Sequence, residues 1–445
     1  MYNCSNLSKI FATDIVNVAN NAFDGCVSIK ETTTSAVVAT LIAKSTKSNV
    51  SLTITSGDIV DNAFNNNKYI VSVNININNI TRIGEHSFEN CTNLAEVYVS
   101  DSLREIGSGA FMGTAWYNNH ADGIVYIGKI AYKYKGIMPD DTTVVLNDGT
   151  LKIHEDAFKD QKGLVGITVP KSVVSIAANA FDGCDNFTTI TSNMFEDCTA
   201  LTEFTIPSSV TKIETSAFKN CSALTSITIS SKVTNIESSA FLDCTGLSTV
   251  NWNATACTKA GDYDSYIFSG CTNLTTVNIG ENVTTIPSYT FRGCTGMTSI
   301  TVASGNTTYH SAGNCLIKTA SKTLVLGCKN SIIPTDGSVT GIMSDAFYGC
   351  TGLTSITIPD SVTSIGRYAF SGCTGLTSVT IGSGVTRTSI DPDVFYGCTG
   401  LTSITVANGN TKYHSAGNCL IETASKTLVL GCKNSIIPTD GSVTG

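Results

Sequence analysis

The sequence has 445 residues, of which 42% are hydrophobic and only 14% are charged, and its formal net charge is −8. It contains no run of Lys or Arg, so it lacks the clustered cations that nucleic-acid backbones require. No apolar run reaches the roughly 18 residues needed to span a bilayer, so we expect no membrane insertion within this sequence.

One motif, Phe-x-x-Cys-x-x-Leu-x-x-Ile-x-Ile, recurs along the chain, and most copies begin 23 residues after the previous one, as Phe218 and Phe241 do. A fixed period of about 20–29 residues with this hydrophobic pattern is typical of a leucine-rich repeat solenoid, which grows one coil at a time. The first residues already fit the motif, because Cys4 and Leu7 place Met1 at its aromatic position. We therefore predict one continuous solenoid over residues 1–445.

The coil that begins at Phe347 shows how one repeat should fold. Alternation over Ile356 and Ile358 predicts a short strand with these two side chains inward and Ser355 and Thr357 outward. Stacked coils would join such strands into a parallel sheet with a spacing of about 4.8 Å. Each aromatic residue would then be buried against the neighbouring coils.

Three insertions interrupt the repeat, at residues 115–145, 303–341 and 407–445. The first contains β-rich runs over 124–130 and 131–135, and the second has runs over 315–317 and 323–326 around a polar turn. Both patterns predict β-hairpins, and 419–430 repeats the second. The step from Phe181 to Phe195 is only 14 residues, which indicates a shortened coil.

The last insertion is a near copy of the second. Residues 293–341 recur as 397–445 with four changes. The first copy continues into the next coil, whereas the second stops at Gly445. We therefore expect this sequence to be a piece of a longer array, truncated at both ends.

The 17 cysteines first suggest disulfides or metal sites, but their positions favour another interpretation. Most lie three residues after the aromatic position, where other copies carry Asn67, Thr114 or Gln161. We therefore expect buried free thiols in a structural Cys ladder, although Cys315 with Cys328, and Cys419 with Cys432, remain alternatives for disulfides. The predicted ladder includes Cys198, Cys221, Cys244, Cys271, Cys294, Cys350, Cys373 and Cys398.

Two groups of residues are candidates for binding. The outward strand positions should line a concave face, which either binds a ligand or only solvates the sheet. These positions are Glu96, Tyr98, Glu203, Thr205, Ser226, Thr228, Thr249, Asn251, Thr276 and Asn278. The first insertion adds the densest aromatic segment, which is either an interface or the cover of a solenoid edge. Its aromatic residues are Trp116, Tyr117, Tyr126, Tyr132 and Tyr134.

The full motif, Phe-x-x-Cys-x-x-Leu-x-x-Ile-x-Ile-Pro-x-Ser-Val-x-x-Ile-x-x-x-Ala, resembles the BspA-like, or Treponema pallidum-type, leucine-rich repeat. The resemblance covers almost the whole chain. It implies a β-rich solenoid with no catalytic motif and a location on the cell surface or outside the cell. It also implies an adhesin-like role for some members.

Together these patterns predict a non-catalytic module that binds an extracellular protein or glycan, without a cofactor or metal. The alternative is a structural spacer or stalk in a larger surface protein, since the late copies are almost uniform in Ser and Thr. No group of acid, base and nucleophile stands out from the repeat, so an enzyme is not expected.

Overall fold

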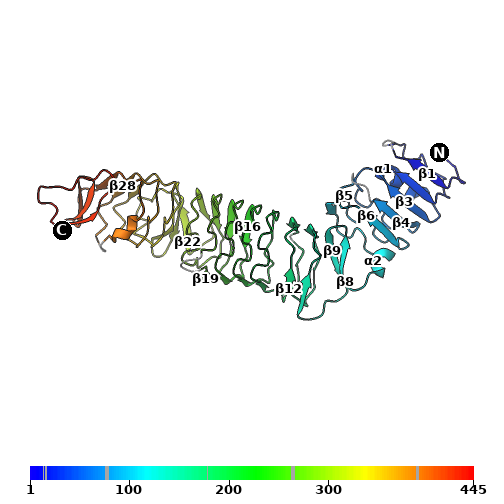
Figure 1. Ribbon diagram of the computed structural model, residues 1–445, viewed down its shortest axis with the longest axis horizontal. Coiled ribbons are helices and arrows are strands. Elements are labelled where there is room, and N and C mark those ends of the chain that lie inside the picture. The colour runs from blue at the N-terminus through cyan, green and yellow to red at the C-terminus, as the bar shows by residue number, and fades with distance from the viewer. Residues whose placement is uncertain are drawn as a thin grey trace. The chain divides into compact units, whose positions relative to one another are not determined.

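The structure is a computed structural model that describes all residues except 14, 16–17, 76–79, 178, 262–265, 387–389 and 445. Its contacts divide the chain into two compact units. Unit 1 comprises residues 1–165 and 172–186, and unit 2 comprises 166–171 and 187–445. The predicted solenoid fold is confirmed within each unit (Figure 1). That one solenoid runs through residues 1–445 stays a prediction.

Each regular coil contributes a first strand, which follows the Leu position of the motif, and a two-residue second strand on another side of the coil. Successive first strands pair in parallel, as Ser355↔Ser378 and Ser378↔Ser403 do. The first strand Ser355–Ile358 alternates between exposed and buried residues, so the predicted inward and outward positions are confirmed.

In unit 1 the first strands form a five-stranded sheet that lies beside helix α1 (Figure 1). Its strands, in spatial order, are β1 (Lys9–Ala12), β2 (Glu31–Thr34), β3 (Val50–Ile54), β4 (Ile70–Ile75) and β6 (Glu96–Val99). The other elements of this part of the chain are α1 (Ala36–Ser45), β5 (Arg82–Ile83), β7 (Glu105–Ile106), α2 (Ala115–Asn119), β8 (Gly123–Ile127), β9 (Ile130–Lys135), β10 (Thr142–Val145), β11 (Lys152–Ile153), β12 (Leu164–Thr168, which runs into residues of unit 2) and β13 (Ser175–Ile176).

In unit 2 the first strands form two parallel sheets. One sheet comprises β16 (Ser226–Ile229), β18 (Thr249–Trp252), β20 (Thr276–Ile279) and β21 (Ser299–Val302), and the other β26 (Ser355–Ile358), β28 (Ser378–Ile381) and β29 (Ser403–Val406). Second strands are β14 (Thr189–Ile190), β15 (Lys212–Ile213), β17 (Asn235–Ile236), β19 (Lys259–Ala260), β25 (Gly341–Ile342) and β27 (Ser364–Ile365), and a 3₁₀ helix η1 spans Pro392–Phe395.

The insertions contain the predicted hairpins, with two differences. In the first, β8 and β9 turn at Gly128-Lys129, which lies inside the predicted first run, because Gly128 adopts the left-handed φ of +56° that a tight turn needs. The other two insertions each have a third strand. These strands are β22 (Tyr309–Ala312), β23 (Cys315–Lys318) and β24 (Thr323–Leu326), repeated as β30 (Tyr413–Ala416), β31 (Cys419–Glu422) and β32 (Thr427–Leu430).

The short coil after Phe181 lacks its first strand. Ile190 lies only three residues beyond the buried Phe187, yet it pairs with Ile213 in the sheet of second strands. The chain therefore passes directly from the Leu position to the second strand, which explains the 14-residue step.

Stacked phenylalanines form the core of both units. In unit 2, the ring centroid of Phe218 lies 4.9 Å from that of Phe195 and 4.9 Å from that of Phe241, with interplanar angles of 16° and 2°. In unit 1, Phe88 stacks in the same way between Phe64 and Phe111. Since every ring is covered by its neighbours, each coil depends on the next for burial.

Candidate functional site

The cysteine position of the motif is a hydrogen-bonding position. Cys221 Sγ–H donates to the carbonyl of Phe195 (3.1 Å), and Cys244 Sγ–H donates to that of Phe218 (3.0 Å), so each thiol reaches the aromatic residue of the preceding coil. The same arrangement holds for Cys91, Cys184, Cys271, Cys294, Cys373 and Cys398.

At two of the positions where the cysteine is replaced, another donor makes an equivalent bond to the preceding coil, whereas Thr114 Oγ1 donates within its own coil to Phe111 O (2.8 Å). Asn67 Nδ2 donates to Ala43 O (2.8 Å) and Gln161 Nε2 donates to Gly136 O (3.2 Å). In the first coil Met1 stands at the aromatic position, and Cys26 Sγ–H donates to its carbonyl oxygen (2.7 Å). The position therefore selects a side-chain donor of limited size rather than sulfur chemistry.

All 17 cysteines lie within the described residues and each is a free thiol, including Cys315, Cys328, Cys419 and Cys432. Burial raises the pKa of the Cys91 thiol to about 12, and a hydrogen bond with the backbone of Asn67 acts in the opposite direction. Buried, protonated thiols are poor nucleophiles.

We expect a thiol reagent at pH 8 to modify the folded protein first at Cys4, which is exposed, and more slowly at the half-buried Cys398 and Cys432, because the thiolate and not the thiol reacts. In denaturant without reductant, all 17 thiols should react. Mass spectrometry of the labelled protein provides the measurement. Rapid labelling of Cys221 or Cys244 in the folded protein would contradict the burial, and fewer than 17 thiols after unfolding would indicate disulfides.

In unit 2 the outward residues of the first strands form a hydrogen-bonded row. Asn251 Nδ2 donates to Thr228 Oγ1 (3.1 Å), Asn278 Nδ2 donates to Asn251 Oδ1 (2.9 Å), and Thr301 Oγ1 donates to Asn278 Oδ1 (2.6 Å). The row borders an open hollow of about 370 Å³. Ser226, Thr249 and Thr276 lie on the same strands, two residues before the members of the row.

Glu203 and Thr205 are exposed, with Phe204 and Ile206 buried between and after them, but they lie outside any strand. The predicted strand is therefore absent here, although the predicted alternation of outward and inward residues is present. Phe204 inserts its ring between Phe195 (4.8 Å) and Phe218 (5.1 Å), and Pro207 follows without an N–H for a ladder.

In unit 1, Glu96 and Tyr98 are outward residues of β6. The side chain of Tyr98 is 52% exposed, and its hydroxyl donates to Glu96 Oε2 (3.4 Å). Strand β6 is the last strand of its sheet among the described residues.

The five aromatic residues of the first insertion divide into two groups. Tyr117 takes the Leu position of its coil and is buried, and Tyr132 is 1% exposed. Burial raises the pKa of Tyr132, whose hydroxyl oxygen accepts a hydrogen bond from the backbone N–H of Phe111 (3.3 Å). These two tyrosines belong to the core, whereas Trp116, Tyr126 and Tyr134 are half-buried.

Trp116 and Tyr126 converge with Tyr98 on one hollow of about 400 Å³, which we call the aromatic groove. It is lined by Val97, Tyr98, Val99, Trp116, His120, Tyr126, Ile127 and Gly128. The structure thus brings together a strand residue and two insertion residues that were predicted as members of two separate groups. Tyr117, Tyr132 and Tyr134 do not line the groove.

Local contacts hold the groove in place. Thr114 caps α2 by accepting from Tyr117 N (3.0 Å), and the ring of Trp116 packs against Phe111 (5.4 Å). Tyr126 Oη accepts from Asn147 N (3.0 Å). His120 was not among the predicted residues. Its Nδ1 contacts Trp116 O (2.8 Å), and its ring lies 4.5 Å from the indole ring. The spacing of four residues between Trp116 and His120 is the sequence signal for this contact, because residues four apart face each other on a helix.

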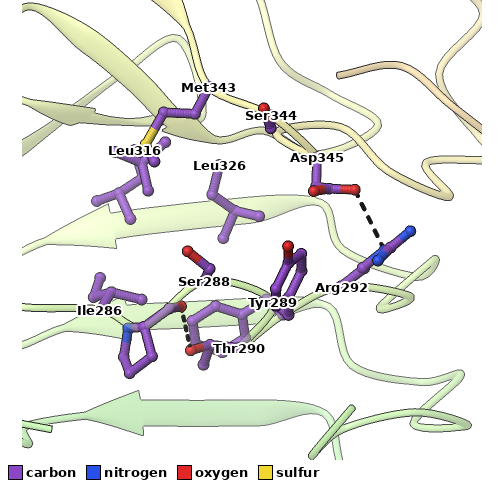
Figure 2. A pocket seen from close by; sticks show the side chains of 13 residues that line it. Ile286, Ser288, Tyr289, Thr290, Arg292, Leu316, Leu326, Met343, Ser344 and Asp345 are labelled. Carbon is purple, nitrogen blue, oxygen red and sulfur yellow. Dashed lines mark hydrogen bonds and ion pairs between the residues drawn. The ribbon is translucent and has the colours of Figure 1, made fainter. Parts of the chain in front are cut away.

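A third hollow, a cavity of about 280 Å³, lies in unit 2 where the insertion 303–341 interrupts the phenylalanine stack (Figure 2). Leu316, Leu326 and Met343 line one wall, and Tyr289 lies opposite. Arg292 forms a buried ion pair with Asp345, with Nε and Oδ1 3.4 Å apart. Its guanidinium lies 3.6 Å from the ring centroid of Tyr348.

The described part of the chain contains no group of three His, Cys, Asp or Glu residues that could hold a metal ion. Among the helices of the described ranges, none has the length and apolar character that crossing a membrane requires.

Comparison with known proteins gives a family model described as a BspA type leucine rich repeat region in six copies. It matches residues 1–114, 43–136, 125–193, 188–315 and 323–440. A comparison with curated protein sequences gives no match.

Three solved structures illustrate the similarity in fold. A leucine rich cell surface protein from Faecalibacterium prausnitzii is 23% identical, with 65% of this chain and 94% of that chain covered and a TM-score of 0.35. A leucine-rich repeat protein from Bacteroides ovatus is 20% identical over 91% of this chain and 93% of that chain, with a TM-score of 0.32. The leucine rich repeat protein of T. pallidum is 22% identical over 56% of this chain and 82% of that chain, with a TM-score of 0.20.

Proposed function

The chain belongs to the BspA-type leucine-rich repeat family, and from this membership we propose that it is a non-catalytic binding module on the cell surface or in the extracellular medium. Its ligand would be an extracellular protein or glycan, bound without a cofactor, as expected of an adhesin-like protein. Leucine-rich repeats supply extended surfaces that bind partners through many coils at once.

The aromatic groove is the observation that carries this proposal. Aromatic side chains are enriched at the energetically dominant positions of interfaces because they combine a large apolar face with a polar edge. Tyr98 is exposed without a cover, and Trp116 and Tyr126 are fixed by their neighbours. A preformed aromatic surface loses little conformational entropy when a ligand binds.

A spacer function is favoured for the late coils of unit 2. The outward residues of β26, β28 and β29 are all Ser or Thr, and strand propensity and solvation alone account for them. In this proposal the late coils extend the molecule, and recognition belongs to the groove of unit 1.

We expect Tyr98→Ala to weaken ligand binding by about tenfold or more, as truncation of a central aromatic contact does. The ligand is first identified by incubating the full chain with an array of matrix proteins and glycans. Tyr396→Ala is the matched control, because Tyr396 is 69% exposed and belongs to unit 2, outside the aromatic groove. Unchanged binding by Tyr98→Ala would rule out the aromatic groove as the binding site. If no component of the array binds, the spacer function would apply to the whole chain.

A further inference from the structure

Unit 1 has an open strand position beside β6. The coil that begins at Phe111 should place its first strand there, 23 residues after β6, over residues 119–122. That stretch instead contains the end of α2 and the turn that leads to β8. Within the described residues, β6 pairs only with β4.

The aromatic groove lies at this open position. Val97 and Val99 point to the interior of the coil, yet both are only half-buried. Their counterparts in the neighbouring strand β4, Val73 and Ile75, are 0% and 2% exposed. The two valines therefore have an uncovered side, which a further strand would cover.

We propose that an extended segment of another polypeptide binds here as an added strand, parallel to β6. This inference rests on the proposed binding function of the aromatic groove and names the class of its ligand. An edge strand presents main-chain N–H and C=O groups at the spacing of a polypeptide, and an added strand of about four residues satisfies them. A glycan has no such matching repeat of donors and acceptors.

The existing sheet indicates which side chains the added strand should carry. Lys9, Glu31, Ser51, Ser72 and Glu96 occupy one column across the five strands. At the far end of this column, Lys9 Nζ and Glu31 Oε2 form an ion pair at 2.6 Å. Glu96 is exposed, so a Lys or Arg opposite it would repeat the same cross-strand pair.

The remaining positions follow from the groove. The second residue would point inward beside Val97 and should be aliphatic, and the third would lie opposite Tyr98 and should be aromatic. The fourth lies beside Val99, where the turn that follows β8 approaches closely. A Cβ added to Gly128 would be 3.5 Å from Val99 Cγ2, so a small residue is favoured.

The sequence Lys-Ile-Phe-Ala of β1 satisfies all four requirements and already forms a parallel strand at the other edge of this sheet. It is therefore the probe of choice. A capped, fluorescent peptide containing Lys-Ile-Phe-Ala is titrated with the full chain, and binding is followed by fluorescence anisotropy. We expect saturable binding, weakened about fivefold or more by Tyr98→Ala and by Glu96→Lys.

Two comparisons separate strand addition from ordinary surface binding. A peptide with Glu in place of Lys should prefer the Glu96→Lys variant over the unchanged chain, whereas Glu203→Lys should alter neither peptide's binding. Two further peptides carry N-methyl groups on alternate residues, one on the first and third residues and the other on the second and fourth. Only one of them should lose binding, because only one of these two sets of N–H groups faces β6.

Absence of saturable peptide binding, or equal tolerance of both N-methylated peptides, would overturn the inference. A glycan bound through Tyr98 without any peptide binding would also overturn it and leave the proposed function intact. The full chain is also tested for concentration-dependent self-association. If self-association is lost in Lys9→Glu and restored in Lys9→Glu/Glu96→Lys, the strand that binds beside β6 is β1 of a second copy, and the proposal of a foreign partner is overturned.

Discussion

Replacing Arg292 with alanine is expected to destabilise unit 2 by about 3–5 kcal/mol, as removal of one partner of a buried ion pair does. The side chains of Arg292 and Asp345 are only 5% and 12% exposed. Without the guanidinium, the Asp345 carboxylate would remain buried beside an apolar cavity wall, and burial already raises the pKa of this carboxyl. The contact with the Tyr348 ring would be lost as well.

The measurement is equilibrium unfolding in urea, combined with hydrogen exchange of the coils around Phe291 and Phe347. A double variant, Arg292→Met/Asp345→Leu, is the matched control, because apolar replacement of both charges leaves no buried charge unpaired. We expect it to recover most of the loss. A single variant within about 1 kcal/mol of the unchanged chain would show that water or rearrangement solvates Asp345.

The second large effect is expected for Phe218→Ala, which should cost about 3–5 kcal/mol. Phe218 is fully buried, and its ring contacts three others, those of Phe195, Phe204 and Phe241. Alanine would leave a cavity that the stacked rings on either side cannot close, since their own neighbours hold them in place.

Because a solenoid is stabilised by contacts between adjacent coils, the loss should be local. Hydrogen exchange should accelerate in the coils that begin at Phe195, Phe218 and Phe241, with little change in unit 1. Phe11→Ala provides the control, because Phe11 is 66% exposed and its truncation should change the stability by less than about 0.5 kcal/mol. An undetectable change in Phe218→Ala would contradict the stacked core.

The regular coils could be predicted from the sequence because every coil meets the same requirements. The alternation at Ile356 and Ile358 recurs with a fixed period, so the pattern of buried residues in one coil predicts that of the next regular coil. The tolerance for Asn67 and Gln161 at the cysteine position was visible as well. Its reason, a donor to the preceding coil, required the geometry.

Exceptions to the period were harder to predict. Helix α1 does not follow from the repeat, whose motif has the period of a strand, although Val38, Ala39, Ile42 and Ala43 have helical spacing. The aromatic groove depends on α2 replacing a strand, and neither the helix nor the convergence of Trp116 with Tyr98 follows from a 23-residue repeat. Irregular coils are therefore where a sequence of this kind specifies least and where the structure adds most.

The bond from most cysteine positions to the aromatic carbonyl one coil earlier also bears on how such genes change length. In a run of regular coils, such as those that begin at Phe195, Phe218 and Phe241, each coil offers the acceptor that its successor needs and uses the acceptor of its predecessor. Unequal recombination that adds or removes whole regular coils would therefore recreate the same bond between the coils that it joins. The repetition of residues 293–341 as 397–445 has the form of such an event, and the residue just before the block differs, Arg292 at the first copy and Tyr396 at the second.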